Sequence, residues 1–199
     1  MALAVGPCMN MRMSPTNLVV PTFTQMLSTM SGWLDKAQKA SGGAADRLLL
    51  ARLAPDMFPL GTQVRFACVQ AWEAVCRLKG EDFPAFITTL LDEGRNAGEH
   101  PGTVADAQAR ISETMAMLDR LAPDALDGDP GRTIAHALPT GMTFDLTAEQ
   151  YVRDWTLPQL YFHLMTAYAI LRSQGVDIGK ADYVPHMFAY LRPGTLPAA

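Results

Sequence analysis

The chain has 199 residues, of which 49% are hydrophobic and 18% are charged, and its formal net charge is −4. This is enough apolar material for the core of one domain and too little charge for a disordered chain. An acidic chain without a basic face is not typical of a nucleic-acid-binding protein, so we expect no nucleic-acid partner. The three cysteines form no CxxC motif, which favours neither a zinc knuckle nor a redox site.

Residues 1–14 predict a flexible N-terminal extension. They are mildly apolar, but no basic region precedes their apolar part, and Gly6 and Pro7 interrupt it, which is not typical of a signal peptide. The uncharged run from Trp155 to Leu171 is short for a membrane span and contains a proline and a histidine. We therefore expect a soluble, cytoplasmic protein without a membrane partner.

Apolar residues at three- and four-residue spacing predict the first long helix over 17–40. A short helix over 45–53 follows. The second long helix is predicted over 60–79, where Gly80 provides a residue suited to the left-handed conformation that ends many helices. Residues 81–102 are predicted to be a connector with one or two helical turns around 86–91.

The third long helix is predicted to begin at Thr103, a residue type that caps helix N-termini. Its apolar stripe extends to Leu121. Residues 132–138 and 142–146 then carry β-branched and aromatic side chains on both sides of a Pro-Thr-Gly turn. This pattern predicts a small β-hairpin.

Thr147 and Gln150 fit a capping box, which predicts a fourth long helix from there to about Ser173, with a kink at Pro158. Four amphipathic helices and one hairpin predict an all-α fold, a four-helix bundle with the hairpin before the last helix. We assign residues 15–183 to this bundle and expect residues 184–199 to form an irregular tail.

His163, in the middle of the uncharged run, is the central candidate for chemistry. Burial on an apolar helix disfavours the imidazolium and lowers the pKa, so His163 would act as a neutral base or a hydrogen-bond acceptor. Its neighbours four residues away are Gln159 and Ala167, which give no second histidine on that helix face, so we predict no metal and no cofactor. The alternative is a packed core histidine with a Tyr or Gln partner.

Polar residues on two helices and in the segments before them are candidate companions of His163. Gln63 and Gln70 are seven residues apart and so line one flank of the second helix. The predicted catalytic residues are His163, Tyr161 and Asp56. The predicted ligand-binding residues are Gln63, Gln70, Tyr168 and Asp154.

Three segments resemble one branch of the DinB/YfiT-like superfamily, a branch known only as a domain of unknown function. The segments are "VPTFTQMLSTMSGWLDKA" (20–37), "ARLAPDMFPLGTQV" (51–64) and "EQYVRDWTLPQLYFHLMTAYAILRSQGVDIGKADY" (149–183). The resemblance covers about residues 15–183 and implies a four-helix bundle, often a homodimer.

Many members of that superfamily hold a divalent metal with three histidines, one from the second helix and an H-x-x-x-H pair from the fourth. Some relatives transfer or isomerise groups with small thiols. Of that histidine set only His163 has a counterpart here, because Gln159 and Ala167 stand where its partner would be and Gln70 stands near the helix-two position. The resemblance therefore implies the fold more than the metal chemistry.

Three functions remain open from the sequence. The leading hypothesis is a bundle without the complete metal triad that binds an unknown small, partly apolar molecule in an inter-helix pocket beside His163. The second is an enzyme, either a metal-dependent transferase or isomerase like its superfamily or a cofactor-free acid–base catalyst using His163. The third is a structural or partner-binding dimer whose interior is simply packed.

Overall fold

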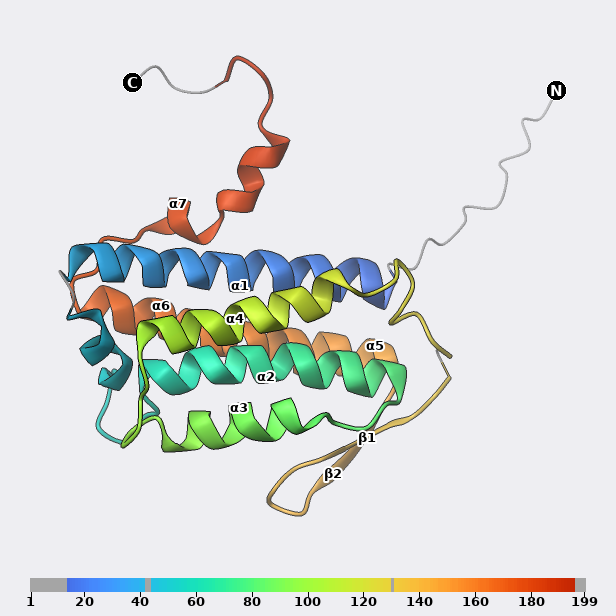
Figure 1. Cartoon of the computed structure of the whole chain (residues 1–199). Coiled ribbons are helices and arrows are strands. Elements are labelled where there is room, and N and C mark those ends of the chain that lie inside the picture. Colours follow the sequence, from blue (N-terminus) through green and yellow to red (C-terminus); the bar gives the residue numbers. More distant parts are fainter. Residues whose placement is uncertain (1–13, 42–43, 130, 196–199) are drawn as a thin grey trace.

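The computed structural model describes residues 14–41, 44–129 and 131–195. Four long helices pack side by side, and a small β-hairpin projects from one end of the bundle (Figure 1). This confirms the predicted all-α, four-helix fold. The predicted extension over 1–14 lies outside the described residues, except for Ser14. The long helices are α1 (Pro15–Ala40), α2 (Leu60–Lys79), α4 (Val104–Asp119) and α6 (Leu157–Ser173), and a shorter helix, α3 (Ala85–Asn96), packs on α2.

The ends of the long helices follow from local chemistry. The Ser14 side chain caps α1, and Pro15 takes the first helical position, where no backbone N–H is needed. Gly80 ends α2 in the left-handed region with φ 73°, which costs a glycine little. Thr103 and Asp106 form a capping box at the start of α4. These boundaries agree with the predicted helices two and three.

α2 is the central helix and packs against α1, α3, α4 and α6. Small side chains along it, such as Ala67 and Ala71, are fully buried and let the neighbouring helices approach closely. Because its neighbours cover much of its circumference, some of its polar side chains are removed from water and need hydrogen-bond partners. The buried polar residues of α2 are Thr62, Gln63 and Arg65.

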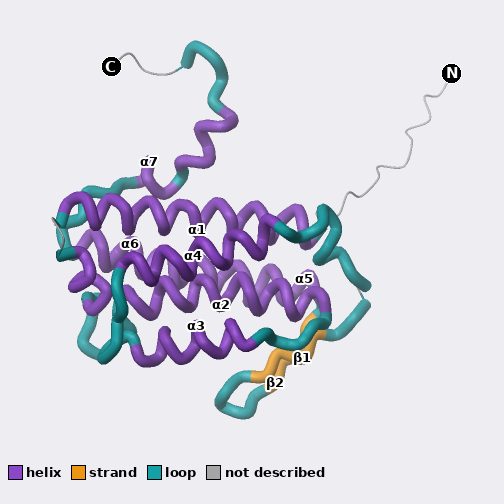
Figure 2. Tube along the Cα trace, in the orientation of Figure 1, coloured by secondary structure: helices purple, strands orange, loops and turns teal. Residues whose placement is uncertain are grey.

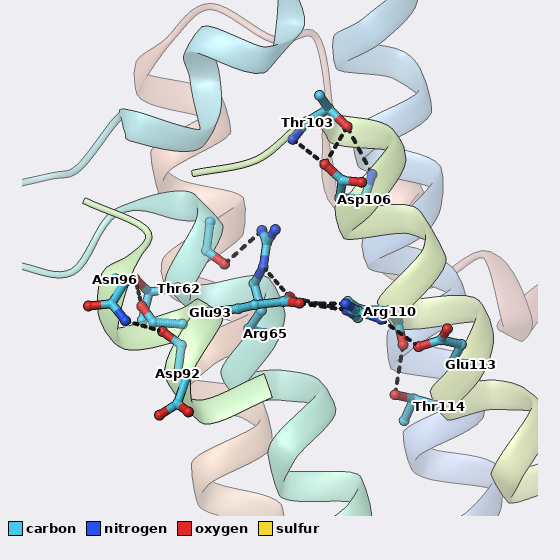
Figure 3. Close-up of polar contacts among 12 residues, drawn as sticks. Thr62, Arg65, Asp92, Glu93, Asn96, Thr103, Asp106, Arg110, Glu113 and Thr114 are labelled. Carbon is cyan, nitrogen blue, oxygen red and sulfur yellow. Dashed lines mark hydrogen bonds and ion pairs between the residues drawn. The ribbon is translucent and has the colours of Figure 1, made fainter. Parts of the chain in front are cut away.

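The Glu93 carboxylate on α3 binds both Arg65 of α2 and Arg110 of α4 (Figure 3). Only 3% of the Arg65 side chain is exposed, and its Nε lies 3.4 Å from Oε2 of Glu93. Arg110 on α4 reaches the same carboxylate, with its Nε 3.1 Å from each oxygen. Hydrogen bonds from Arg110, with a smaller contribution from Arg65, lower the pKa of Glu93 below its usual value. The carboxylate therefore stays charged and connects three helices.

The segment predicted to be a connector contains a complete helix, so the one or two helical turns predicted around 86–91 were too short an estimate. α3 has 12 residues and buries Ile87, Leu90 and Gly94 on one face. The Oγ1 of Thr62 on α2 donates to the Gly94 carbonyl at 2.7 Å. The polar residues of the opposite face, within "DEGRN", obscured this stripe in the sequence.

The last long helix begins with the predicted capping box at Thr147 and Gln150, but its first part is not a regular α-helix. A short α5 (Ala148–Gln150) leads into a π-helical turn, Tyr151–Thr156, before α6 begins. Pro158 follows this turn and has no N–H to donate to the carbonyl four residues earlier, which favours local disruption of the α-helical ladder. The sequence predicted a kink at Pro158, and the structure has this π-helical turn directly before the helix that contains Pro158.

The hairpin pairs β1 (Ile134–Ala137) with β2 (Thr143–Leu146) in antiparallel register, as predicted (Figure 2). Gly141 turns the chain between the strands with φ 88°. Only one face of β1 is buried, and it carries Ile134 and His136. The hairpin is therefore attached to the bundle by few side chains.

Two short segments differ from the predictions. The helix expected over 45–53 is a 3-10 helix, Ala45–Leu50. The tail, expected to be irregular, contains a 3-10 helix at Pro185–Tyr190, just after the short helix α7 (Lys180–Tyr183). Across the described ranges, none of the helices combines the length and the apolar character that a membrane span requires.

Candidate functional site

His163 lies on the face of α6 that packs against α2, and 8% of it is exposed. Its Nδ1 is 2.9 Å from Oε1 of Gln63 on α2. The other end of the same amide, Nε2 of Gln63, donates to the Phe58 carbonyl at 3.1 Å. Burial lowers the pKa of His163 to about 4, so the ring is neutral at pH 7.

Three phenylalanines surround this polar pair. The ring of Phe66 meets the His163 ring edge-on with centroids 5.5 Å apart, and Phe162 does so at 5.4 Å. Phe58 packs on Phe66 at 5.8 Å. Phe58 and Phe162 are 52% and 59% exposed, which is unusual for such large apolar side chains. We call these five residues, His163, Gln63, Phe58, Phe66 and Phe162, the His163 cluster.

The Nε2 atom of His163 is the polar atom that this cluster leaves without a partner among the described residues. It is not among the unpartnered atoms that are fully enclosed by protein, in contrast to both ring nitrogens of His136. The cluster thus combines a neutral imidazole nitrogen that lacks a partner among the described residues with exposed aromatic surface.

Of the predicted companions of His163, the structure brings only Gln63 to it. Tyr161 and Tyr168 lie on other sides of α6, since positions two and five residues from His163 are about 200° and 140° around a helix. The Tyr168 ring packs edge-on against Trp33 at 5.3 Å, and its hydroxyl is 3.5 Å from the Ile178 carbonyl. These tyrosines belong to the α1 side of the bundle.

The remaining predicted site residues are also apart from His163. Asp154 is exposed and pairs with Arg153 at 2.7 Å. Asp56 is exposed in the segment before α2. Gln70 is half-buried on α2 and has no hydrogen bond to another residue of the described chain. Gln70 lies seven residues beyond Gln63 on α2. At the rise of an α-helix this is about 10 Å along the helix axis, so Gln70 lies away from His163, which contacts Gln63.

The three phenylalanines were missed by the sequence-based reasoning, which searched only for polar companions. Phe162 is the direct neighbour of His163, and Phe58 lies in the "MFPL" segment before α2. Their exposure could not be inferred from residue type, because phenylalanine is usually buried.

A second buried histidine, His136 on β1, was also not predicted to be perturbed. Only 2% of it is exposed, and its ring lies against Trp155 and Tyr151 with centroids 4.1 Å and 5.7 Å away. Neither ring nitrogen has a hydrogen-bond partner in the described structure. Burial, with a smaller effect from Arg77, lowers its pKa to about 4. His136 therefore fastens the hairpin to the π-helical turn as a neutral ring.

The His163 cluster does not match the three-histidine metal site of the superfamily. Gln63 occupies one side of the ring, and no group of three or more His, Cys, Asp or Glu side chains suited to a metal occurs in the part of the chain that the structure describes. A carboxamide is a weaker donor to such metals than imidazole or carboxylate. These donors do not fit the site that the resemblance implies.

Two cavities, of about 360 and 350 Å³, lie at the C-terminal end of α2. Both are lined by Cys76, Glu81 and Asp82, and neither is lined by a residue of the His163 cluster. The cluster is therefore an open aromatic surface with a polar atom in it, and neither of these cavities is the expected inter-helix pocket beside His163.

Comparisons with known proteins agree with this architecture. The model of the family described as "Domain of unknown function (DUF1993)" matches residues 16–184. The crystal structure of a DinB family member from Shewanella denitrificans is 30% identical in sequence and superposes with a TM-score of 0.68, covering 92% of this chain and 95% of that one. No curated protein matches the chain.

Proposed function

Because the chain belongs to the DUF1993 family of DinB-like proteins, whose function is unknown, we propose a function from geometry: it binds a small, partly apolar molecule at the His163 cluster. The observation that carries this proposal is the pairing of half-exposed phenylalanine rings with Nε2 of a neutral histidine, an atom without a hydrogen-bond partner among the described residues.

The apolar part of the binding free energy would come from Phe58 and Phe162. Covering roughly 50 Å² of each ring would contribute about 2.5 kcal/mol at 25 cal/mol per Å². This is modest, and it fits a small ligand on an open surface better than a large one in an enclosed cavity. The polar contact at His163 would orient the ligand.

Binding accounts for His163 better than acid–base catalysis does. A general base works best when its pKa lies near the operating pH. A pKa of about 4 leaves His163 unprotonated at pH 7 but gives it little tendency to take a proton. The role that fits this ring is that of a hydrogen-bonding group.

The test uses two small probes, p-cresol and 4-methylanisole, titrated into labelled protein and followed by NMR of the aromatic side chains. We expect saturable shifts at Phe58 and Phe162 with at least one probe. Phe162→Ser should abolish them. The matched control is Phe188→Ser, because Phe188 is equally exposed at 58% but belongs to the 3-10 helix Pro185–Tyr190. Figure 1 shows this segment on the far side of α1 from α2.

Two results would contradict the proposal. One is the absence of saturable shifts with either probe, and the other is unchanged binding by folded Phe162→Ser protein. A dimer would be recognised by sedimentation. If, in addition to either result, the wild-type protein sediments as a dimer and Phe162→Ser as a monomer, the exposed rings form an interface between two copies of the chain. The dimer hypothesis then replaces the proposed binding of a small molecule.

A further inference from the structure

We propose that the ligand of the His163 cluster is a neutral hydroxyl compound, an apolar alcohol or phenol, whose O–H donates a hydrogen bond to Nε2 of His163. This rests on the binding function proposed above and adds the chemical class of the ligand. The inference depends on the hydrogen bonds that run from Phe58 through Gln63 to His163.

The first step is the orientation of the Gln63 amide. A backbone carbonyl can only accept hydrogen bonds, so the group that lies 3.1 Å from the Phe58 carbonyl must be the NH₂ end of the amide. The reversed amide would set two acceptor oxygens against each other in a buried position, since only 3% of Gln63 is exposed. The Phe58 carbonyl thus determines that Oε1 points at His163.

The second step is the tautomer of His163. The Gln63 Oε1 is an acceptor only, and it lies 2.9 Å from Nδ1. Nδ1 must therefore carry the ring proton and donate it. A neutral imidazole has one N–H, so Nε2 is left with a lone pair and no proton. The position that faces a ligand is an acceptor.

The third step concerns charge. Burial lowers the pKa of His163, and no charged side chain of the described residues contributes to the shift. A carboxylate ligand would place its own lone pairs against that of Nε2 with no cation nearby. An ammonium ligand would lose hydration against the phenylalanine rings without an anionic partner. A neutral O–H donor meets neither penalty.

The ring environment agrees with a hydroxyl on an apolar body. Phe66 and Phe162 both pack against the imidazole with ring planes nearly perpendicular to it and with centroids 5.5 and 5.4 Å away, so the imidazole has aromatic neighbours. A molecule that donates to Nε2 would place its carbon skeleton against Phe162 and Phe58.

The experiment has two parts and needs no variant of the cluster. Long-range ¹H–¹⁵N spectra of the wild-type protein at pH 7 should show His163 protonated at Nδ1 and not at Nε2. Then p-cresol, 4-methylanisole and p-toluate are titrated separately. 4-Methylanisole has nearly the shape of p-cresol but no O–H, and p-toluate replaces the O–H by a carboxylate.

We expect p-cresol to bind roughly fivefold more tightly than 4-methylanisole, the value of one ordinary hydrogen bond. It should also shift the Nε2 resonance of His163, while p-toluate should not bind. Equal binding of p-cresol and 4-methylanisole would overturn the hydroxyl inference and leave the proposed function intact. Tighter binding of p-toluate, or a proton on Nε2, would also overturn the inference. If none of the three probes binds, the proposed function itself fails.

Discussion

Gly94→Ala is a sharp test of how α3 supports the His163 cluster. A Cβ at Gly94 would lie 2.4 Å from Cε1 and 2.7 Å from Cδ1 of Phe66, which is closer than real Cβ contacts permit. Phe66 in turn packs on His163 and Phe58, so it cannot move freely. The new methyl group must push α3 away from α2 or displace the Phe66 ring toward the cluster.

Two opposing terms set the expected size. Overpacking of this kind costs about 1–3 kcal/mol, whereas replacing a glycine inside a helix by alanine stabilises it by about 1 kcal/mol. At a separation of 2.4 Å the clash should dominate. We therefore expect Gly94→Ala to lower the free energy of unfolding by up to about 2 kcal/mol and to weaken p-cresol binding.

Gly32→Ala is the matched control. Gly32 lies inside α1, and a Cβ there would meet nothing within 4 Å. The control should gain up to about 1 kcal/mol from helix propensity alone. The assay is urea unfolding of both variants followed by far-UV circular dichroism. If Gly94→Ala stabilises the protein as much as Gly32→Ala does, Phe66 is not held in place and the argument from packing is wrong.

Two further perturbations test the buried charges and the hairpin. Glu93→Gln should lower the free energy of unfolding by about 1–3 kcal/mol, because Arg65 would lose its carboxylate in a buried site. Glu113→Gln, at a half-exposed partner of Arg110, should cost less than about 0.5 kcal/mol in the same urea assay. For His136 the folded pKa of about 4 lies below the ordinary 6.5, so the unfolded chain binds the proton more readily. Stability should therefore fall as the pH drops from 6.5 to 4, by up to about 3 kcal/mol for this residue. His136→Leu should remove this part of the loss of stability at low pH, while the part due to His163 remains. If the stability of His136→Leu falls as steeply with pH as that of wild type, the role given to His136 is wrong.

The parts of the fold that could be predicted are those with local causes. The limits of α2 and the start of α4 depend on Gly80 and on the Thr103–Asp106 pair, whose effects act within a few residues. The hairpin follows from β-branched residues around a turn. α3 was underestimated because its apolar face is narrow and its polar face dominates the local composition.

The candidate site could be predicted only in part. His163 and Gln63 were both named from the sequence, and the structure joins them at 2.9 Å. Tyr161, Tyr168 and Gln70 were named as well, but helical geometry turns the two tyrosines to the α1 side and carries Gln70 along α2. Sequence spacing shows which residues share a helix face, but it does not show which face meets which neighbour.

The sequence by itself determined the helices, the hairpin and the single histidine in an uncharged run, because these depend on periodicity and on capping over short distances. The tertiary structure alone decided that His163 meets Gln63, that Phe58 orients the amide and that Phe58 and Phe162 stay exposed beside it. Those contacts join residues up to 100 positions apart, and they exist only after α2 and α6 have packed together.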